Sequence, residues 1–211
     1  SDNRRPGLTG SNNDDTRHVR SPLGLFRGAF RRRAYIFRHP KHNCYQDADM
    51  TISQGDTLPD ATFIVMGESG PETVSLADKT KGRKVVLFAV PGAFTPTCHS
   101  AHVPSFIRTK EALMEKGVDE IICVAVNDPF IMQTWGEASG ATEAGITMLA
   151  DAEAEFTKSI GMNFSAPPVG FVDRSSRYAM LVEDGKVNLL QVDENPGTCE
   201  LSAGEALLDS M

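Results

Sequence analysis

This chain of 211 residues lacks long hydrophobic runs, has few cysteines and carries no excess of positive charge. It has no run of about eighteen or more apolar residues, so the pattern predicts no membrane-spanning helix. Its four cysteines are too few for a disulfide-held secreted scaffold, and no Cys-x-x-Cys pair occurs, which excludes an oxidoreductase of that type. A net charge of −7 argues against a dedicated nucleic-acid binder. The hydrophobic content of 40% is sufficient for a packed core.

The net charge conceals a division of the chain. Residues 1–49 hold ten Lys or Arg against five Asp, a net charge of +5, whereas residues 50–211 hold eleven basic and twenty-three acidic residues, a net charge of −12. The basic leader has no methionine and no clear apolar period, and folded-domain patterning begins at Met50. We therefore expect a poorly ordered extension over 1–49 and one domain over 50–211.

Three interpretations of the leader stay open. It is an over-called start or added segment with Met50 as the initiator, an organelle transit peptide, or a basic arm for a membrane surface or nucleic acid. Residues 16–46 are Arg-rich and lack acids, as transit peptides do. The first interpretation predicts a cytoplasmic protein, and the second predicts a mitochondrial one.

From Met50 onward, apolar runs that predict strands alternate with capped segments that predict helices. Gly67–Gly70 and Asp184-Gly185 indicate hairpin turns. The predicted strands are 61–65, 72–75, 84–90, 120–126, 146–150, 178–182 and 187–192, and the predicted helices begin near Cys98, Asp128, Asp151 and Ser202. The order of elements predicts an α/β domain with a thioredoxin-like fold, in which helices flank a central mixed sheet and a β-hairpin is added at the N-terminus.

Two of the helix predictions depend on single residues. The helix from Cys98 to about Lys116 contains Pro104, which predicts a kink. Ser202-Ala-Gly-Glu205 has the spacing of a capping box, which predicts that Ser202 is the N-cap of the last helix.

The most informative stretch is Pro91-Gly-Ala-Phe-Thr-Pro-Thr-Cys98, between a buried strand and a helix. The carboxyl ends of strands in open α/β sheets are where ligands bind. The unpaired amides and dipole of a helix N-terminus favour an anion, here a nucleophilic thiolate. Thr95 can place a hydroxyl beside the sulfur and an incoming oxygen, and the two prolines keep the loop rigid. Cys98 is thus a candidate nucleophile.

Two other interpretations of Cys98 stay open at this point. One is a buried structural cysteine, because free cysteines are often buried. The other is a metal site that combines Cys98, His99 and His102, since the spacing of Cys98 and His102 puts both on one helix face. The sequence offers no matching fourth ligand, which disfavours this site.

The motif Pro91-x-x-x-Thr95-x-x-Cys98 resembles the active-site motif of peroxiredoxins. The longer run from Val90, with His102-Val-Pro104 after it, resembles the type II (peroxiredoxin-five-like) subfamily, and the resemblance extends from about residue 52 to the C-terminus. It implies a thiol-dependent peroxidase that reduces hydrogen peroxide and alkyl hydroperoxides through a cysteine sulfenic acid, with a part in antioxidant defence and cell redox homeostasis. Further matches are Cys123-Val-Ala-Val-Asn-Asp128, Trp135 and Arg177–Gly185.

The resemblance also implies the roles of individual residues. Cys98 is expected to be the peroxidatic nucleophile, and Thr95 and Arg177 match the Thr and Arg of the family motif. An Arg side chain, which donates several hydrogen bonds and stays charged, would stabilise the thiolate and the charge on the breaking O–O bond. Pro91 and Gly92 are expected to form the substrate loop.

The other cysteines differ in context. Cys199 lies in a Pro-Gly-Thr-Cys loop that we expect to be exposed and mobile, and its position resembles that of the resolving cysteine in atypical two-cysteine members. A Cys98–Cys199 disulfide would then form, although an external thiol as the resolving group stays open. Cys123 lies within a predicted strand and is expected to be a core residue.

Partners follow from the resemblance alone. Thioredoxin and glutathione with glutaredoxin both fit as reductants, a homodimer is expected, and no cofactor or metal is implied. His99 departs from the subfamily, which commonly has a small polar residue after the cysteine, and we expect it to be a spectator. A non-enzymatic peroxide sensor or redox-regulated binding protein on the same scaffold stays open, because it too would need a reactive Cys98.

Overall fold

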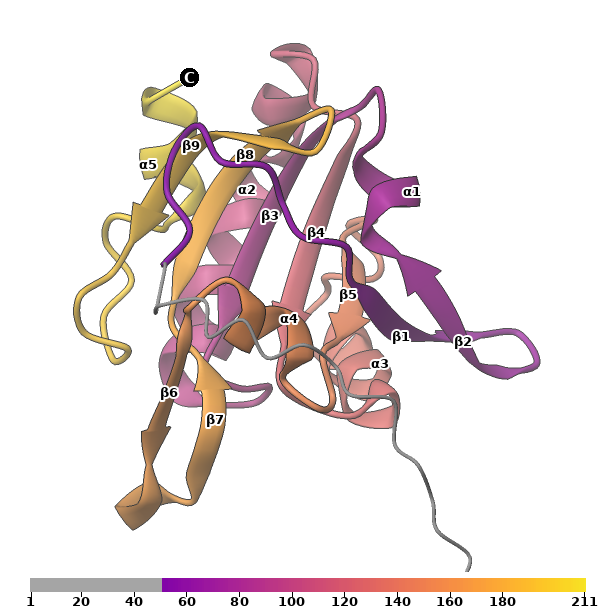
Figure 1. The fold of residues 1–211 in the computed structure, drawn as a ribbon, viewed down its shortest axis with the longest axis vertical. Helices are drawn as coiled ribbons and strands as arrows, with labels where there is room; N and C mark the ends of the chain where they lie inside the picture. The colour runs from indigo at the N-terminus through magenta and orange to yellow at the C-terminus, as the bar shows by residue number, and fades with distance from the viewer. Residues whose placement is uncertain (1–50) are drawn as a thin grey trace, which may run out of the picture. The chain divides into compact units, whose positions relative to one another are not determined.

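A computed structural model describes residues 51–211, so the predictions for residues 1–49 lie outside the described part of the chain (Figure 1). The strands are β1 (Thr62–Gly67), β2 (Gly70–Ser75), β3 (Lys84–Val90), β4 (Glu120–Ala125), β5 (Thr147–Ala150), β6 (Asn163–Ala166), β7 (Phe171–Ser175), β8 (Tyr178–Glu183) and β9 (Lys186–Val192). The helices are α1 (Leu76–Thr80), α2 (Val103–Glu115), α3 (Pro129–Ala138), α4 (Glu155–Ser159) and α5 (Gly204–Asp209), with a π-helical turn η1 (Cys98–His102) and a 3₁₀ turn η2 (Pro167–Val169). Within residues 51–211, no helix is long and apolar enough to cross a membrane.

Seven strands form one mixed sheet in the order β2-β1-β5-β4-β3-β8-β9. The three central strands, β5, β4 and β3, are parallel, and antiparallel hairpins complete both edges. This arrangement confirms the predicted thioredoxin-like layout with its N-terminal β-hairpin. It also puts the C-terminal end of β3, where the Cys98 loop begins, in the middle of the sheet.

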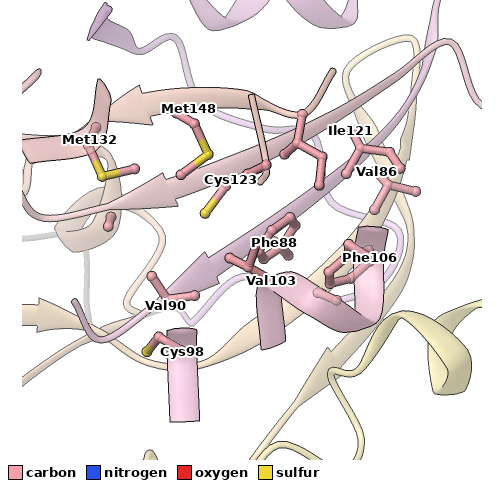
Figure 2. Close-up of a cluster of buried hydrophobic side chains, with 14 of the residues drawn as sticks. Val86, Phe88, Val90, Cys98, Val103, Phe106, Ile121, Cys123, Met132 and Met148 are labelled. Carbon is pink, nitrogen blue, oxygen red and sulfur yellow. The ribbon is translucent and has the colours of Figure 1, made fainter. Parts of the chain in front are cut away.

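Helices cover both faces of the sheet, and Figure 1 shows α2 on one side and α4 on the other. Alternate residues of β3 supply the two cores, because successive side chains of a strand point to opposite faces. Val86, Phe88 and Val90 pack toward α2, α3 and α5, whereas Val85 and Leu87 pack toward α1 and α4. On the α2 face the rings of Phe88 and Phe106 stack 4.1 Å apart between their centroids. Figure 2 shows both rings in the buried cluster that also contains Cys98.

Several elements differ from the sequence-based predictions. The helical stretch begins near Cys98 as predicted, but its first turn is π-helical. Pro104 lies in the first turn of α2, where its missing N–H leaves no α-helical bond unmade. The prediction that Ser202 caps the last helix is wrong. The N-cap is Ala203, and the Ser202 hydroxyl donates to Asp193 instead.

The sequence pattern missed two elements, α1 and the β6–β7 hairpin. The hairpin forms a separate two-stranded sheet, and Figure 1 shows it extending away from the main sheet beside α4. Its strands have only four and five residues, and η2 with its two prolines joins them, so the sequence resembles a loop. This hairpin forms part of the candidate site.

Candidate active site

Cys98 is held at the end of a short loop that leaves the carboxyl end of β3. The side chain is fully buried, and Figure 2 shows it near Val90 at one end of the core cluster. The loop is fixed internally, because the Thr95 amide bonds the carbonyl of Gly92 at 3.4 Å and the His99 amide bonds that of Thr95 at 2.9 Å. The backbone of the adjacent exposed Phe94 has φ 60°, a left-handed conformation that is uncommon for a residue with a side chain.

Arg177 contacts the Cys98 sulfur directly. Its Nη2 donates to the sulfur at 3.3 Å and to the carbonyl of Pro196 at 2.8 Å, and its Nη1 bonds Nδ1 of His102 at 3.1 Å. The guanidinium is almost wholly buried, with 1% of the residue exposed. The enclosed positive charge of Arg177 therefore lies within hydrogen-bond distance of the Cys98 sulfur.

His102 is buried behind Arg177, against the rings of Phe88 and Phe106. Its Nε2 lies 2.9 Å from the carbonyl oxygen of Ser202, which can only accept, so Nε2 carries the proton and Nδ1 accepts from Arg177. Burial, with the charge of Arg177 adding to it, lowers the pKa of His102 to about 3. The imidazole is therefore neutral at physiological pH.

The hydroxyl of Thr95 donates to the carbonyl of Gly92 at 2.9 Å. Among the hydrogen bonds of residues 51–211, the Cys98 sulfur receives its bond from Arg177 and not from Thr95. The same loop is bound from outside by Asn127, whose Oδ1 accepts from the amide of Ala93 at 3.0 Å. Because its hydrogen is engaged, the Thr95 oxygen is available as an acceptor.

A pocket of about 500 Å³ opens over this loop. Its polar wall includes Thr95 and Arg177, and most of its exposed lining is apolar. Cys98 does not itself line the pocket, but its sulfur accepts a hydrogen bond from Arg177, which does. The remaining lining residues are Pro91, Pro96 and Thr97 from the loop, Phe164, Ala166, Val169 and Phe171 from the β6–β7 hairpin, and Pro196 and Gly197 from the segment before Cys199.

Cys123 and Cys199 are free thiols, like Cys98. Cys123 is buried in β4 as predicted, and burial raises its pKa well above the usual value. Cys199 is partly buried rather than openly exposed, and burial raises its pKa to about 11. Its segment lies against the site, because the Thr97 hydroxyl donates to the carbonyl of Gly197 at 2.7 Å.

The proposed metal ligands have other partners. Both ring nitrogens of His102 are engaged, and Nδ1 of His99 accepts from the indole N–H of Trp135 at 3.2 Å. His99 therefore links the first turn after Cys98 to the buried Trp135 of α3. The described part of the chain holds no group of three His, Cys, Asp or Glu arranged for a metal ion.

The structure brings Thr95, Cys98 and Arg177 together, with Pro91 and Gly92 in the same loop. The sequence interpretation missed His102 as the partner of Arg177, Asp193 and Ser202 behind His102, and the bond from the Cys98 loop to Asn127. A histidine four positions after Cys98, on the same helix face, was the available signal for His102. Asn127 belongs to the matched stretch Cys123–Asp128 and Ser202 to the expected capping box, but no local pattern marked their contacts with Ala93 and His102, which are 34 and 100 positions away. No local pattern marked Asp193 either.

Comparisons with known proteins show the family to which the chain belongs. Residues 53–208 match a protein-family model described as Redoxin. The chain therefore belongs to the redoxin family, whose thioredoxin-like fold is the one observed. Its relatives in this family are peroxiredoxins of type II, and the chain is likewise a peroxiredoxin, a thiol peroxidase with an antioxidant function.

Three similar proteins illustrate the match. The chain is 46% identical over 165 residues to "Peroxiredoxin-2E-2, chloroplastic" of Oryza sativa subsp. japonica, which covers 76% of this chain and 73% of the relative. It is 40% identical over 136 residues to "Peroxiredoxin-2F, mitochondrial" of Arabidopsis thaliana, covering 64% and 67%. Reduced Prx3 of Vibrio vulnificus in complex with H2O2 superimposes with a TM-score of 0.71 at 44% identity, covering 76% and 99%.

Proposed function

We propose that Cys98 is the peroxidatic nucleophile of this thiol peroxidase. The observation that carries the proposal is the 3.3 Å hydrogen bond from Arg177 to its sulfur, at the wall of the 500 Å³ pocket. The Cys98 thiolate attacks one peroxide oxygen, so that an S–O bond forms as the O–O bond breaks. The other oxygen leaves with a proton as water or an alcohol, and Cys98 becomes a sulfenic acid.

Arg177 and Thr95 would act on the peroxide oxygens. The guanidinium cannot lose its proton, so it stabilises both the thiolate and the charge that develops on the breaking O–O bond. The hydroxyl of Thr95 already donates to Gly92, so its oxygen accepts the proton-bearing end of the peroxide. Together they align the O–O bond with the sulfur.

The apolar side of the pocket suits organic hydroperoxides. Phe164, Val169 and Phe171 offer an apolar wall opposite the polar wall of Thr95 and Arg177. An alkyl group gains free energy when it leaves water for such a wall, whereas hydrogen peroxide needs only the polar end. We therefore propose that the site accepts both substrates.

Replacing Cys98 by Ser tests the proposed nucleophile. The variant is expected to lose peroxide-dependent oxidation of reduced thioredoxin, or of glutathione with glutaredoxin, in a coupled assay. Wild-type turnover with either reductant also identifies the electron donor. Oxidation of wild-type Cys98 without turnover with either donor would instead support a peroxide sensor or a redox-regulated binding protein.

Cys199 is proposed as the resolving cysteine. The raised pKa of about 11 keeps Cys199 a thiol at neutral pH while it stays in this position, so it does not compete for peroxide. Its attack on the Cys98 sulfenic acid forms a disulfide and releases water, and two external thiols then restore both cysteines. The loop contacts through Pro196 and Gly197 support a short approach to Cys98.

We also propose that the protein forms homodimers. Three large apolar side chains, Phe94, Phe130 and Ile131, are exposed, and they belong to the active-site loop and to α3. The amide of Ala93 in that loop donates to Asn127, two residues before α3. Sedimentation of wild type and a Phe130→Asp variant tests the proposal, with a dimer expected to become a monomer.

An organelle location is proposed for the leader. The relatives include proteins named chloroplastic and mitochondrial, and residues 16–46 combine many Arg with no acidic residue. A fluorescent protein carrying residues 1–49 is expected to enter an organelle. A cytoplasmic signal equal to that of the unfused fluorescent protein would contradict this and favour the cytoplasmic alternative.

A further inference from the structure

One carboxylate closes the loop that runs from the end of β9 to the start of α5. Oδ1 of Asp193 accepts from the amides of Glu200 at 3.1 Å and Leu201 at 2.8 Å, and Oδ2 accepts from the hydroxyl of Ser202 at 2.5 Å. The amide of Asp193 in turn donates to the carbonyl of Arg177 at 3.0 Å. The loop of residues 193–202 is thus fixed at both ends beside Arg177.

The closure continues through Ser202 to the imidazole of His102. Because the Ser202 hydroxyl gives its hydrogen to Asp193, its oxygen can only accept toward Nε2 of His102, at 3.3 Å. The Ser202 carbonyl accepts from the same Nε2 at 2.9 Å. Two acceptors therefore face Nε2, which fixes the tautomer that leaves a lone pair on Nδ1.

That lone pair meets Nη1 of Arg177 and orients the guanidinium toward Cys98. Pro196, in the middle of the same loop, provides the second acceptor on Nη2. The guanidinium thus has two supports, and both depend on the position of the loop that Asp193 closes.

Burial raises the cost of losing any of these hydrogen bonds. Ser202 and His102 are fully buried, and Asp193 is 6% exposed, so water does not replace a lost partner. Burial would raise the pKa of Asp193, but the bonds from Ser202 and from the amides of Glu200 and Leu201 outweigh it and leave the pKa lowered. The group that closes the loop is therefore a carboxylate at physiological pH.

We propose that Asp193 is a positioning residue of the peroxidase reaction, which acts through Ser202 and His102 on the guanidinium of Arg177. This inference rests on the proposed roles of Cys98 and Arg177 and adds a residue that does not touch the peroxide. It also means that the segment carrying Cys199 is the one that holds Arg177 in place.

The test replaces Asp193 by Ala in the full chain and follows one turnover with hydrogen peroxide. Fluorescence of Trp135, the only Trp of the chain, monitors the step, because its indole bonds the residue after Cys98. Loss of a hydrogen-bonded support for a charged group is expected to slow Cys98 oxidation about tenfold. The pH dependence of Cys98 alkylation by iodoacetamide, located by mass spectrometry, is expected to move to higher pH because Arg177 no longer faces the sulfur.

Asp151 provides a matched control. It is 3% exposed and accepts from two amides, those of Phe156 and Thr157, and from the Thr157 hydroxyl. None of these hydrogen bonds reaches Cys98, His102 or Arg177. Asp151→Ala should therefore lower the melting temperature about as much as Asp193→Ala does. It should leave the rate of Cys98 oxidation and the pH profile of Cys98 alkylation as in wild type.

Two milder variants keep the test decisive if Asp193→Ala does not fold. Asp193→Asn retains an oxygen for the two amides and should lose less of the rate than the alanine variant. Ser202→Ala leaves the carbonyl on His102 but removes the hydroxyl, and we expect a twofold to threefold slowing. A faster Cys98 oxidation in Asp193→Asn than in Asp193→Ala, without a matching rise in melting temperature, supports a positioning role for Asp193.

The inference is overturned if the foldable Asp193 variants lose stability like Asp151→Ala while rate and alkylation profile stay unchanged. This outcome is distinct from failure of the proposed function. If the proposed function failed, Cys98→Ser would still turn over peroxide, whatever the behaviour of the Asp193 variants.

Discussion

At His102, burial and the charge of Arg177 act in the same direction on the imidazole. The folded protein holds the pKa of His102 at about 3, against 6.5 for an ordinary histidine. Between these values the unfolded chain takes up a proton that the folded chain refuses, so stability falls as the pH drops below about 6.5. From pH 7.5 to pH 5 this amounts to about 2 kcal/mol of unfolding free energy.

Urea unfolding at the two pH values measures this effect. A His102→Gln variant, which can still donate to Ser202 and accept from Arg177, should lose about 2 kcal/mol less than wild type between pH 7.5 and pH 5. His99→Gln is the control and should lose as much as wild type. Equal losses for wild type and His102→Gln would show that His102 does not carry the pH dependence.

The residues of the site were predictable to different depths. The spacing of Thr95 and Cys98 is local, so the sequence motif predicted both, and Arg177 was added by resemblance. The bond from Arg177 to His102 spans 75 positions and the bond from His102 to Ser202 spans 100. Such partners are brought together only by the order of strands in the sheet, which no local pattern contains.

At the scale of elements, the β6–β7 hairpin sets one wall of the pocket. Val169 and Val172 are exposed to the same extent, 67% and 66%, but Val169 lines the pocket and Val172 does not. Val169→Asp is expected to lower kcat/KM for cumene hydroperoxide about fivefold, because an apolar contact is replaced by a charge, and to leave kcat/KM for hydrogen peroxide within about twofold.

Val172→Asp is the matched control for this prediction. It adds the same charge to the same hairpin away from the pocket, so both substrates should react as with wild type. Equal losses for the two peroxides in Val169→Asp, or equal effects of the two variants, would refute an apolar substrate wall.

The predicted elements succeeded where burial and local chemistry agree. The apolar run Lys84–Val90 is β3 with the predicted bounds, and Asp128 caps α3 by accepting from the amide of Ile131. Ser202 failed as a cap because the buried carboxylate of Asp193 takes its hydroxyl. The β6–β7 hairpin was missed because short strands around Pro167 and Gly170 have no apolar period and lie outside the main sheet.

At the scale of the whole molecule, the chemistry lies in the acidic part of the chain. The match to the redoxin family begins at residue 53, close to Met50, where the charge changes sign.

Hydrogen peroxide is uncharged, so the net charge of residues 50–211 does not steer it to the site, whereas a charged protein reductant responds to this field. The rate of Cys98 oxidation should therefore vary little with salt, and the rate of reduction by a protein donor should vary more. Stopped-flow measurements of the two half-reactions at low and high ionic strength check this, and an equal salt dependence of both would contradict it.

Intact-mass spectrometry after one equivalent of hydrogen peroxide tests the central claim, that Cys98 reacts with peroxide and Cys199 resolves it. Wild type is expected to lose two hydrogens as the Cys98–Cys199 disulfide forms, Cys199→Ser to gain one oxygen on Cys98, and Cys98→Ser to keep its mass. A stable gain of oxygen in wild type would contradict the resolving role of Cys199. Oxidation of Cys98→Ser at the wild-type rate would contradict the account as a whole.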